Sequence, residues 1–179
     1  MKTSRFLLLA ALAVSTAALA QSPNSVSEKT APSPAQPAFD QLKTLAGHWT
    51  GSVGIDGKDL PMDVTLRVTS LGNTLMHEMK SSTAPDDPIS MFTIDGDHIL
   101  LTHYCDAGNQ PRLVGTVSPD GKTLTFDFVS ATGLLPTQHG HMQHVVFTFI
   151  DPDHHTEKWE FAMADGKSMG ATIDLHRAK

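Results

Sequence analysis

The stretch Met62-Asp63-Val64-Thr65-Leu66-Arg67-Val68-Thr69 decides the fold class, because apolar and polar residues alternate along all of it. A β-strand points successive side chains to opposite faces, so this pattern predicts one face against a core and one in solvent. The same alternation recurs at 123–128, 144–149, 158–163 and 172–176. The pattern favours an all-β domain of antiparallel strands.

Turn-forming residues separate the alternating stretches. Asp-Gly and Asn-containing turns connect hairpins well because they tolerate positive φ, and they occur here at 56–57, 71–73, 86–88, 95–97, 119–121, 151–153 and 165–166. Counting the segments between turns predicts a meander of about ten strands. Closure into an up-and-down barrel would remove exposed edges, and a two-sheet sandwich is the alternative. One short helix is predicted over 38–46, where apolar residues recur at helical spacing.

Composition excludes several classes of protein. The 179 residues are 40% hydrophobic and 18% charged, which suits one globular domain with a core. A net charge of −6 argues against a nucleic-acid-binding surface. No later segment is apolar enough for a membrane span, and the oligomeric state is left open. Cys105 is the only cysteine, so an intrachain disulfide cannot form.

The N-terminus has the three parts of a secretory signal peptide. Lys2 and Arg5 precede the apolar run 6–14, and Ala18-Leu19-Ala20 forms a small-x-small cleavage site before Gln21. We expect residues 1–20 to be removed and the protein to be periplasmic or secreted, if its source is bacterial. Residues 21–38 are rich in Pro and Ser and predict a flexible linker before the barrel domain, 39–179.

The segment Gly47-His48-Trp49-Thr50-Gly51 follows the predicted helix and opens the first strand. This G-x-W-x-G pattern resembles the opening of lipocalin-like (calycin) barrels, which implies that Trp49 closes one barrel end. It is also similar to the opening of nitrobindin-type haem barrels.

More closely, the chain resembles a family of uncharacterised secreted bacterial lipocalin-like proteins over residues 39–177. The motifs that carry this resemblance are Leu-Thr-His-Tyr-Cys at 101–105, Asn-Gln-Pro-Arg at 109–112, Ser-Pro-Asp-Gly-Lys-Thr-Leu-Thr-Phe at 118–126 and Gly-His-Met at 140–142. The chain departs from the family pattern at Gln143, where a second histidine is expected. If such a pair bound something together, the site here is altered.

The interior of a barrel lies on the apolar face of each strand, which selects a set of polar residues for the lumen. His103 and Cys105 share a face with Ile99 and Leu101. Small-molecule sites are mostly apolar with a few polar groups, so we expect a small apolar or amphipathic ligand in the lumen. The candidate ligand-binding residues are His103, Cys105, Arg112, His141, Gln143 and Glu157.

Each candidate also has a purely structural interpretation. A barrel histidine is often only hydrogen-bonded to a neighbouring strand or to a buried water. Cys105 fits a small buried hydrophobe better than a nucleophile, because an active thiolate needs a base or a cation beside it. His77 and Glu78 resemble a general-base pair, but neighbours on a strand face opposite sides.

Metal and haem sites are the remaining cofactor hypotheses. Half of the ten histidines lie at 139, 141, 144, 154 and 155, but His154 and His155 should point to opposite faces, so no metal site is predicted. The loop histidines near Asp151 and Asp153 are expected to be solvated. Haem with a lumen histidine as its axial ligand is the first alternative function, although no C-x-x-C-H motif is present.

Catalysis is the second alternative, with His103 or His141 as general base, and no catalytic residue is assigned. Phosphate-binding loops, G-x-S-x-G elbows and H-E-x-x-H motifs are absent from the sequence. A module that binds a protein partner without using its lumen is a third alternative, for which an exposed apolar patch would be the sign.

Overall fold

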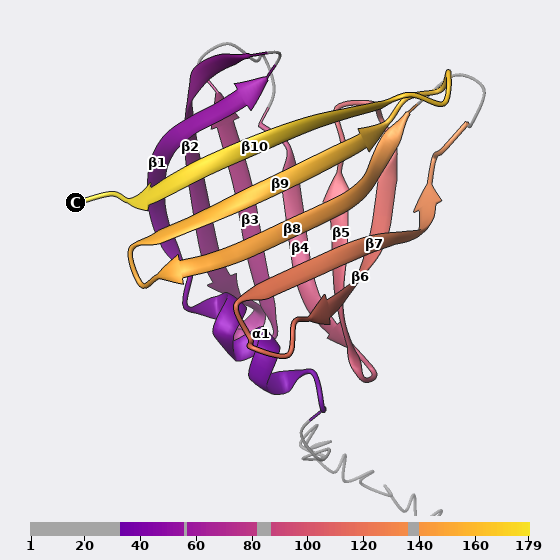
Figure 1. Cartoon of the computed structure of the whole chain (residues 1–179). Coiled ribbons are helices and arrows are strands. Elements are labelled where there is room, and N and C mark those ends of the chain that lie inside the picture. Colours follow the sequence, from indigo (N-terminus) through magenta and orange to yellow (C-terminus); the bar gives the residue numbers. More distant parts are fainter. Residues whose placement is uncertain (1–32, 56, 82–86, 136–139) are drawn as a thin grey trace, which may run out of the picture. The chain divides into compact units, whose positions relative to one another are not determined.

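A computed structural model describes residues 33–179 except 56, 82–86 and 136–139. Within these residues, ten antiparallel strands close into a barrel in the order β1-β10-β9-β8-β7-β6-β5-β4-β3-β2 (Figure 1). This confirms the predicted barrel and rejects the sandwich. The predicted signal peptide, 1–20, and most of the predicted linker lie outside the described residues. The strands are β1 Gly47–Ile55, β2 Lys58–Thr69, β3 Thr74–Ser81, β4 Ile89–Asp95, β5 His98–Tyr104, β6 Gln110–Val117, β7 Thr123–Thr132, β8 His141–Asp151, β9 His154–Ala162 and β10 Ser168–Arg177.

The barrel closes where its first strand meets its last. Trp49 of β1 lies opposite Val64 of β2 on one side and Arg177 of β10 on the other. Each of the ten described strands therefore pairs with two neighbours, so the sheet has no edge strand within the described residues. The short 3-10 turn η1, Ser70–Gly72, joins β2 to β3.

Alternation fills the interior with apolar side chains. Leu66, Leu101, Leu113, Phe126 and Phe147 are at most 2% exposed and form part of one continuous core. Burying a side chain of this size stabilises the fold by roughly 1.5–3 kcal/mol. The core is packed near one end of the barrel and gives way to a cavity toward the other.

A helix covers the packed end of the barrel. Helix α1 spans Gln36–Lys43 rather than the predicted 38–46. It begins earlier because Pro37 suits the first turn of a helix, and it buries Phe39 and Leu42 against the barrel. The chain then leaves the helix through a tighter turn, in which the Leu45 N–H donates to the Leu42 carbonyl at 3.1 Å.

Arg177 connects the end of β10 to the helix end. Its guanidinium donates to the carbonyls of Ala46, at 3.0 Å, and Thr44, at 3.1 Å. The same group lies 4.2 Å from the centroid of the Trp49 ring, at cation–π distance. A cation is favourable near the C-terminal carbonyls of a helix, so Arg177 fastens the helix to the closure strands.

No helix among the described residues combines the length and apolar character needed to cross a bilayer.

Candidate functional site

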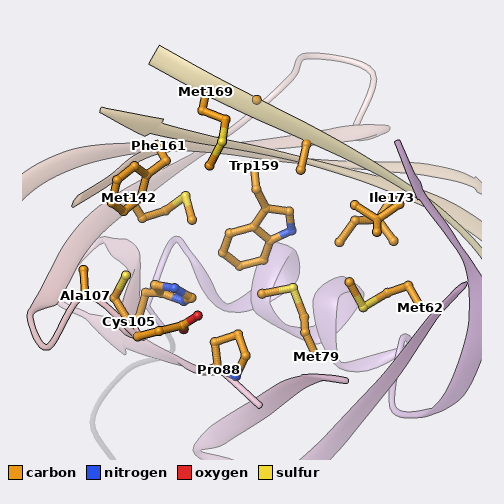
Figure 2. Close-up of a pocket in the computed structure, with 15 residues that line it drawn as sticks. Met62, Met79, Pro88, Cys105, Ala107, Met142, Trp159, Phe161, Met169 and Ile173 are labelled. Carbon is orange, nitrogen blue, oxygen red and sulfur yellow. The ribbon is translucent and has the colours of Figure 1, made fainter. Parts of the chain in front are cut away.

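A cavity of about 380 Å³ occupies the barrel end opposite α1 (Figure 2). Its walls come from strands that are far apart in sequence, including Met62 of β2, Met79 of β3, Trp159 of β9 and Ile173 of β10. Its volume lies in the range of small-molecule sites, roughly 300–1,000 Å³. The remaining lining residues are Val53, Pro88, His103, Cys105, Asp106, Ala107, Met142, Phe161, Met169, Gly170 and Ala171.

Methionines form much of the cavity wall. Met62, Met79, Met142 and Met169 come from four different strands, and Figure 2 shows their side chains around the Trp159 ring. A methionine side chain is unbranched and polarisable, so it adapts to ligands of different shape. This wall is suited to apolar ligands of more than one shape.

His103 is the buried imidazole of the cavity. Its Nδ1 lies 2.8 Å from the Ser90 hydroxyl, and the residue is 2% exposed. Burial lowers the pKa of His103 to about 4, with a smaller contribution from the nearby His77. The ring is therefore neutral at neutral pH and offers one uncharged hydrogen-bonding nitrogen besides the one held by Ser90.

Cys105 lines the cavity as a thiol. Burial raises its pKa, and Asp106 raises it further, against a lowering by a hydrogen bond from the Ala107 backbone. A thiolate is the reactive form, so this environment makes Cys105 a weak nucleophile. Its role in the cavity is that of a small apolar wall residue.

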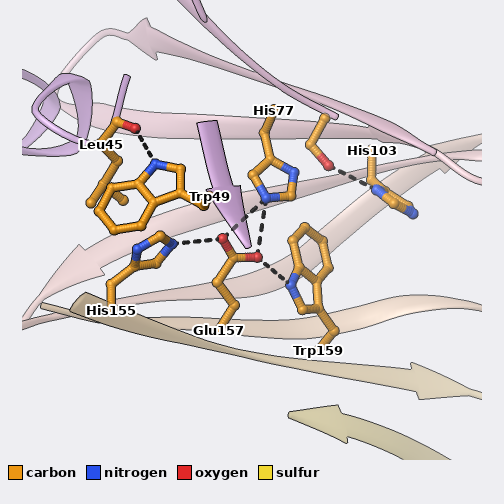
Figure 3. Close-up of polar contacts among 8 residues, drawn as sticks. Leu45, Trp49, His77, His103, His155, Glu157 and Trp159 are labelled. Carbon is orange, nitrogen blue, oxygen red and sulfur yellow. Dashed lines mark hydrogen bonds and ion pairs between the residues drawn. The ribbon is translucent and has the colours of Figure 1, made fainter. Parts of the chain in front are cut away.

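A buried carboxylate stands next to the cavity, at the centre of a polar network (Figure 3). The Glu157 carboxylate lies 3.1 Å from His77 Nε2 and 3.1 Å from His155 Nε2. The indole N–H of Trp159 donates to the same carboxylate at 2.9 Å. All four groups come from β3 and β9, and Trp159 belongs both to this network and to the cavity wall.

The network keeps Glu157 ionised although the residue is fully buried. Burial alone would raise its pKa, but attraction to His77 and hydrogen bonds from His155 and His77 outweigh burial and lower the pKa below its ordinary value. A buried carboxylate needs such donors, because an unpaired charge in the interior is very unfavourable.

Two buried nitrogens of this network are unpaired. His77 and His155 both use Nε2 toward Glu157, and neither Nδ1 has a hydrogen-bond partner among the described residues. Aromatic rings surround them instead: the Trp49 ring meets His155 edge-on at 4.3 Å between centroids. The Trp49 indole in turn donates to the Leu45 carbonyl at 2.7 Å. The network therefore extends from the helix end of the barrel to the cavity.

The structure brings three of the predicted residues together. His103 and Cys105 line the cavity, and Glu157 lies behind the Trp159 wall. Trp49, predicted to close one end, is 1% exposed and lies at the α1 end of the barrel. The placements of His103, Cys105 and Glu157 follow the strand alternation from which they were predicted, whereas the position of Trp49 was expected from the resemblance to lipocalin-like barrels.

The other three predicted residues do not line the cavity. Arg112 is exposed and donates to the Thr132 hydroxyl at 3.2 Å. It was expected to face inward because Val114 was taken as inward-facing, but the structure buries Leu113 instead, so Arg112 points outward. Gln143 donates to Glu160, at 2.8 Å, because the register of β8 shifts between Met142 and His144. That shift brings Met142 into the cavity.

His141 precedes the same irregularity in β8 and is partly exposed. Its ring packs on Phe128, with 4.3 Å between centroids, and burial lowers its pKa. A bulge changes which face the flanking residues occupy, and nothing in the alternation before or after it reveals its position.

Sequence reasoning missed two residues of the buried network, His155 and His77, and also Ser90, the hydrogen-bond partner of His103. His155 was expected to be a solvated loop histidine, but it lies in β9 and is fully buried. His77 was rejected as part of a general-base pair because its neighbour Glu78 faces the opposite side of the strand, as predicted. The hydrogen-bond partner of His77 is Glu157, which lies on the distant strand β9. Ser90 gave no signal. The inward phase of β3, set by Leu75 and Met79, could have identified His77.

Comparison with known proteins places the fold without naming an activity. No family model and no curated protein matches the chain. A solved structure of a protein of unknown function from the DUF3598 family of Nostoc punctiforme is similar, with a TM-score of 0.53 and 14% identity. The match covers 77% of this chain and 49% of that one, so the chain spans about half the length of that protein. At this identity the likeness shows the barrel fold alone.

Proposed function

We propose that this barrel binds a small apolar or amphipathic ligand in the cavity beside His103 and Trp159. The observation that carries the proposal is the cavity itself, about 380 Å³ of space walled by methionine, aromatic and aliphatic side chains. An apolar body in this cavity would remove the apolar wall and its own surface from water, which is the main favourable term in binding.

The polar groups of the cavity fit one end of such a ligand. His103 offers one neutral nitrogen inside, and the exposed Asp106 lies on the cavity lining. A ligand with an apolar body and one hydrogen-bonding group would bury the body among the methionines and pair the polar group with His103. Orientation by a few polar atoms is the usual arrangement in apolar pockets.

A neutral naphthylamine dye that fluoresces in apolar surroundings tests the proposal. We expect saturable binding by the native protein and a loss of roughly tenfold or more in affinity for Ala171→Phe, which places a ring in the cavity. Thr172→Phe is the matched control, because Thr172 is the next residue of β10 and is exposed. Circular dichroism checks that both variants fold.

Equal dye affinity in the two variants would contradict this site. Native mass spectrometry of protein purified without denaturation adds an independent reading, since a co-purifying mass identifies the ligand class. His103→Ala should lower dye affinity more than Arg112→Ala, because only His103 lines the cavity.

Haem is a second candidate, favoured by one feature of His103. Its Nδ1 is engaged by Ser90, so the second nitrogen of a neutral ring is the one left to ligate a metal. A neutral imidazole is the form that binds iron. Titration with hemin and a visible spectrum distinguish this candidate, which predicts a Soret shift that His103→Ala abolishes.

Catalysis by a cavity histidine has less support. A general base works best with a pKa near the operating pH, and the pKa of His103, about 4, makes it a poor proton acceptor at neutral pH.

We also propose that the protein is exported, on the basis of the three-part signal at residues 1–20. N-terminal sequencing of protein from the periplasm or the medium should begin at Gln21. An N-terminus at Met1 in the isolated protein would overturn this proposal.

A further inference from the structure

Two histidines and one aspartate converge on the outer wall of the barrel, away from the cavity. His154 of β9 lies directly opposite His176 of β10, and Asp174 shares the face of His176 two positions before it. One ligand atom from each of the three side chains lies within 4.8 Å of the other two. We propose that His154, Asp174 and His176 bind a divalent transition-metal ion of the Zn²⁺ type.

The distances between these ligand atoms fit one ion. Asp174 Oδ1 lies 2.8 Å from His154 Nε2 and 3.5 Å from His176 Nε2. A zinc ion binds nitrogen and oxygen ligands at about 2.0–2.1 Å, which separates two ligands at the tetrahedral angle by about 3.3 Å. The two observed distances lie on either side of this value, so small side-chain rotations suffice.

The chemistry of the three groups selects the class of metal. Imidazole nitrogen with carboxylate oxygen suits Zn²⁺, Cu²⁺ and Ni²⁺, whereas Ca²⁺ and Mg²⁺ prefer all-oxygen sites. The two imidazole rings lie side by side with 4.1 Å between centroids, and Nε2 of each ring is close to the same Asp174 oxygen. Three protein ligands leave a coordination position for water, as in exchangeable rather than closed sites.

The site is accessible and its charge is suitable. The side chains of His154, Asp174 and His176 are 24%, 54% and 64% exposed, so an ion can reach them from solvent. Asp151 lies opposite His154 in the neighbouring strand β8 and adds negative charge nearby. The neighbouring cation, Arg177, is bonded to Asp153 at 3.1 Å and to backbone carbonyls.

The sequence predicts no metal site because its histidines have no ligand spacing along the chain. The three residues are brought together by the register between β9 and β10, which spacing along the chain does not reveal. His154 and His155 do face opposite sides, as predicted: His155 turns inward to Glu157, and His154 turns outward to Asp174.

Zinc titration of the untagged, EDTA-stripped protein against a chromophoric chelator tests the proposal. We expect one ion per chain, and a weakening of Kd by roughly tenfold or more for each of His154→Gln, Asp174→Asn and His176→Gln. All three residues are partly or largely exposed, so the variants should fold. Ca²⁺ should not compete.

His144→Gln is the matched control. His144 forms a similar pair on the outer wall, with Asp127 at 2.7 Å, and among the described residues no second histidine joins it. We expect its zinc affinity to equal that of the native protein. As a second readout, Zn²⁺ should raise the Tm of the native protein and of His144→Gln but not of His176→Gln.

Two results would overturn the proposal. One is unchanged affinity and stoichiometry in all three site variants, which would place the ion elsewhere on this histidine-rich chain. The other is an equal loss in His144→Gln, which would mean weak binding to surface histidines in general.

Discussion

The Trp159 indole N–H donates to the Glu157 carboxylate at 2.9 Å, while the ring of the same tryptophan forms a wall of the cavity. One side chain therefore joins the buried charge of the barrel to the space in which we place a ligand. Rigid support of this kind holds a binding wall in position, because the indole cannot rotate without giving up its acceptor.

Glu157→Gln should destabilise the protein by about 3 kcal/mol. The amide NH₂ would face N–H groups of His77, His155 and Trp159 that all need an acceptor. The negative charge of the carboxylate, which is attracted to His77, would also be lost. Urea unfolding followed by circular dichroism measures the change. Glu78→Gln, on the opposite face of β3, is the control and should change stability by less than about 0.5 kcal/mol.

Stability should fall as pH drops from about 6.5 to about 4, partly because of His103. The unfolded chain protonates this histidine near pH 6.5, whereas burial delays protonation in the folded state until the pKa of about 4. The unfolded state thus binds more protons across this window, which costs up to about 3 kcal/mol of stability.

His103→Gln should therefore flatten the stability profile between pH 6.5 and 4.5, as measured by urea midpoints at several pH values. His98→Gln, at the exposed start of the same strand, should keep the native slope. A native slope in both variants would contradict the assignment to His103. Glu157 acts in the same direction at lower pH: because its pKa is also lowered, to about 2, its contribution is present above its ordinary pKa of 4.5 and is lost as the pH falls toward 2.

Gly51→Ala should prevent or severely weaken closure of the barrel. An added Cβ would collide with the backbone carbonyl of Asp174 in the neighbouring strand β10. Overpacking against backbone costs typically 1–3 kcal/mol or more, since backbone cannot rotate away. Gly54→Ala in the same strand meets its nearest atom at 3.6 Å and should be tolerated. Thermal unfolding compares the two, and equal Tm values would disprove the contact.

Alkylation of Cys105 should report on occupancy of the cavity. Its raised pKa keeps the thiol protonated, so iodoacetamide should react more slowly with the folded protein than with the urea-unfolded chain. A saturating neutral dye should slow the reaction several-fold further. Mass spectrometry reads the product directly, because the chain has one cysteine. A rate indifferent to dye would place the dye outside this cavity.

Strand alternation accounts for what could be predicted. Patterns such as that of 62–69 identify the inward face of a regular strand, and they placed His103, Cys105 and Glu157 on the inward faces that the structure gives them. The same reasoning put Arg112, His141 and Gln143 inside, and none of the three lines the cavity. In β6 the inward phase is set by Leu113 and not by Val114, and β8 has an extra residue between Met142 and His144 that changes the face.

Register between strands accounts for what could not be predicted. His77 and Glu157 are 80 residues apart, and only the curvature of the closed barrel brings them within 3.1 Å. Ser90 and His103 meet because β4 and β5 pair at that level, and His154 meets His176 in the same way. Local hydropathy carries information about faces but none about which residues stand opposite one another.

The hydrogen bond from the Arg177 guanidinium to the Ala46 carbonyl joins residues 131 positions apart and so affects the order in which the chain can fold. During synthesis β1 is made first and β10 last. Because β1 pairs with β10, the barrel can close only after the last strand has been made. Such distant pairings make folding slow, and until they form, the edges of β1 and of the newest strand lie open to other chains. Shortening the C-terminus by one strand should thus yield an aggregation-prone meander rather than a smaller barrel.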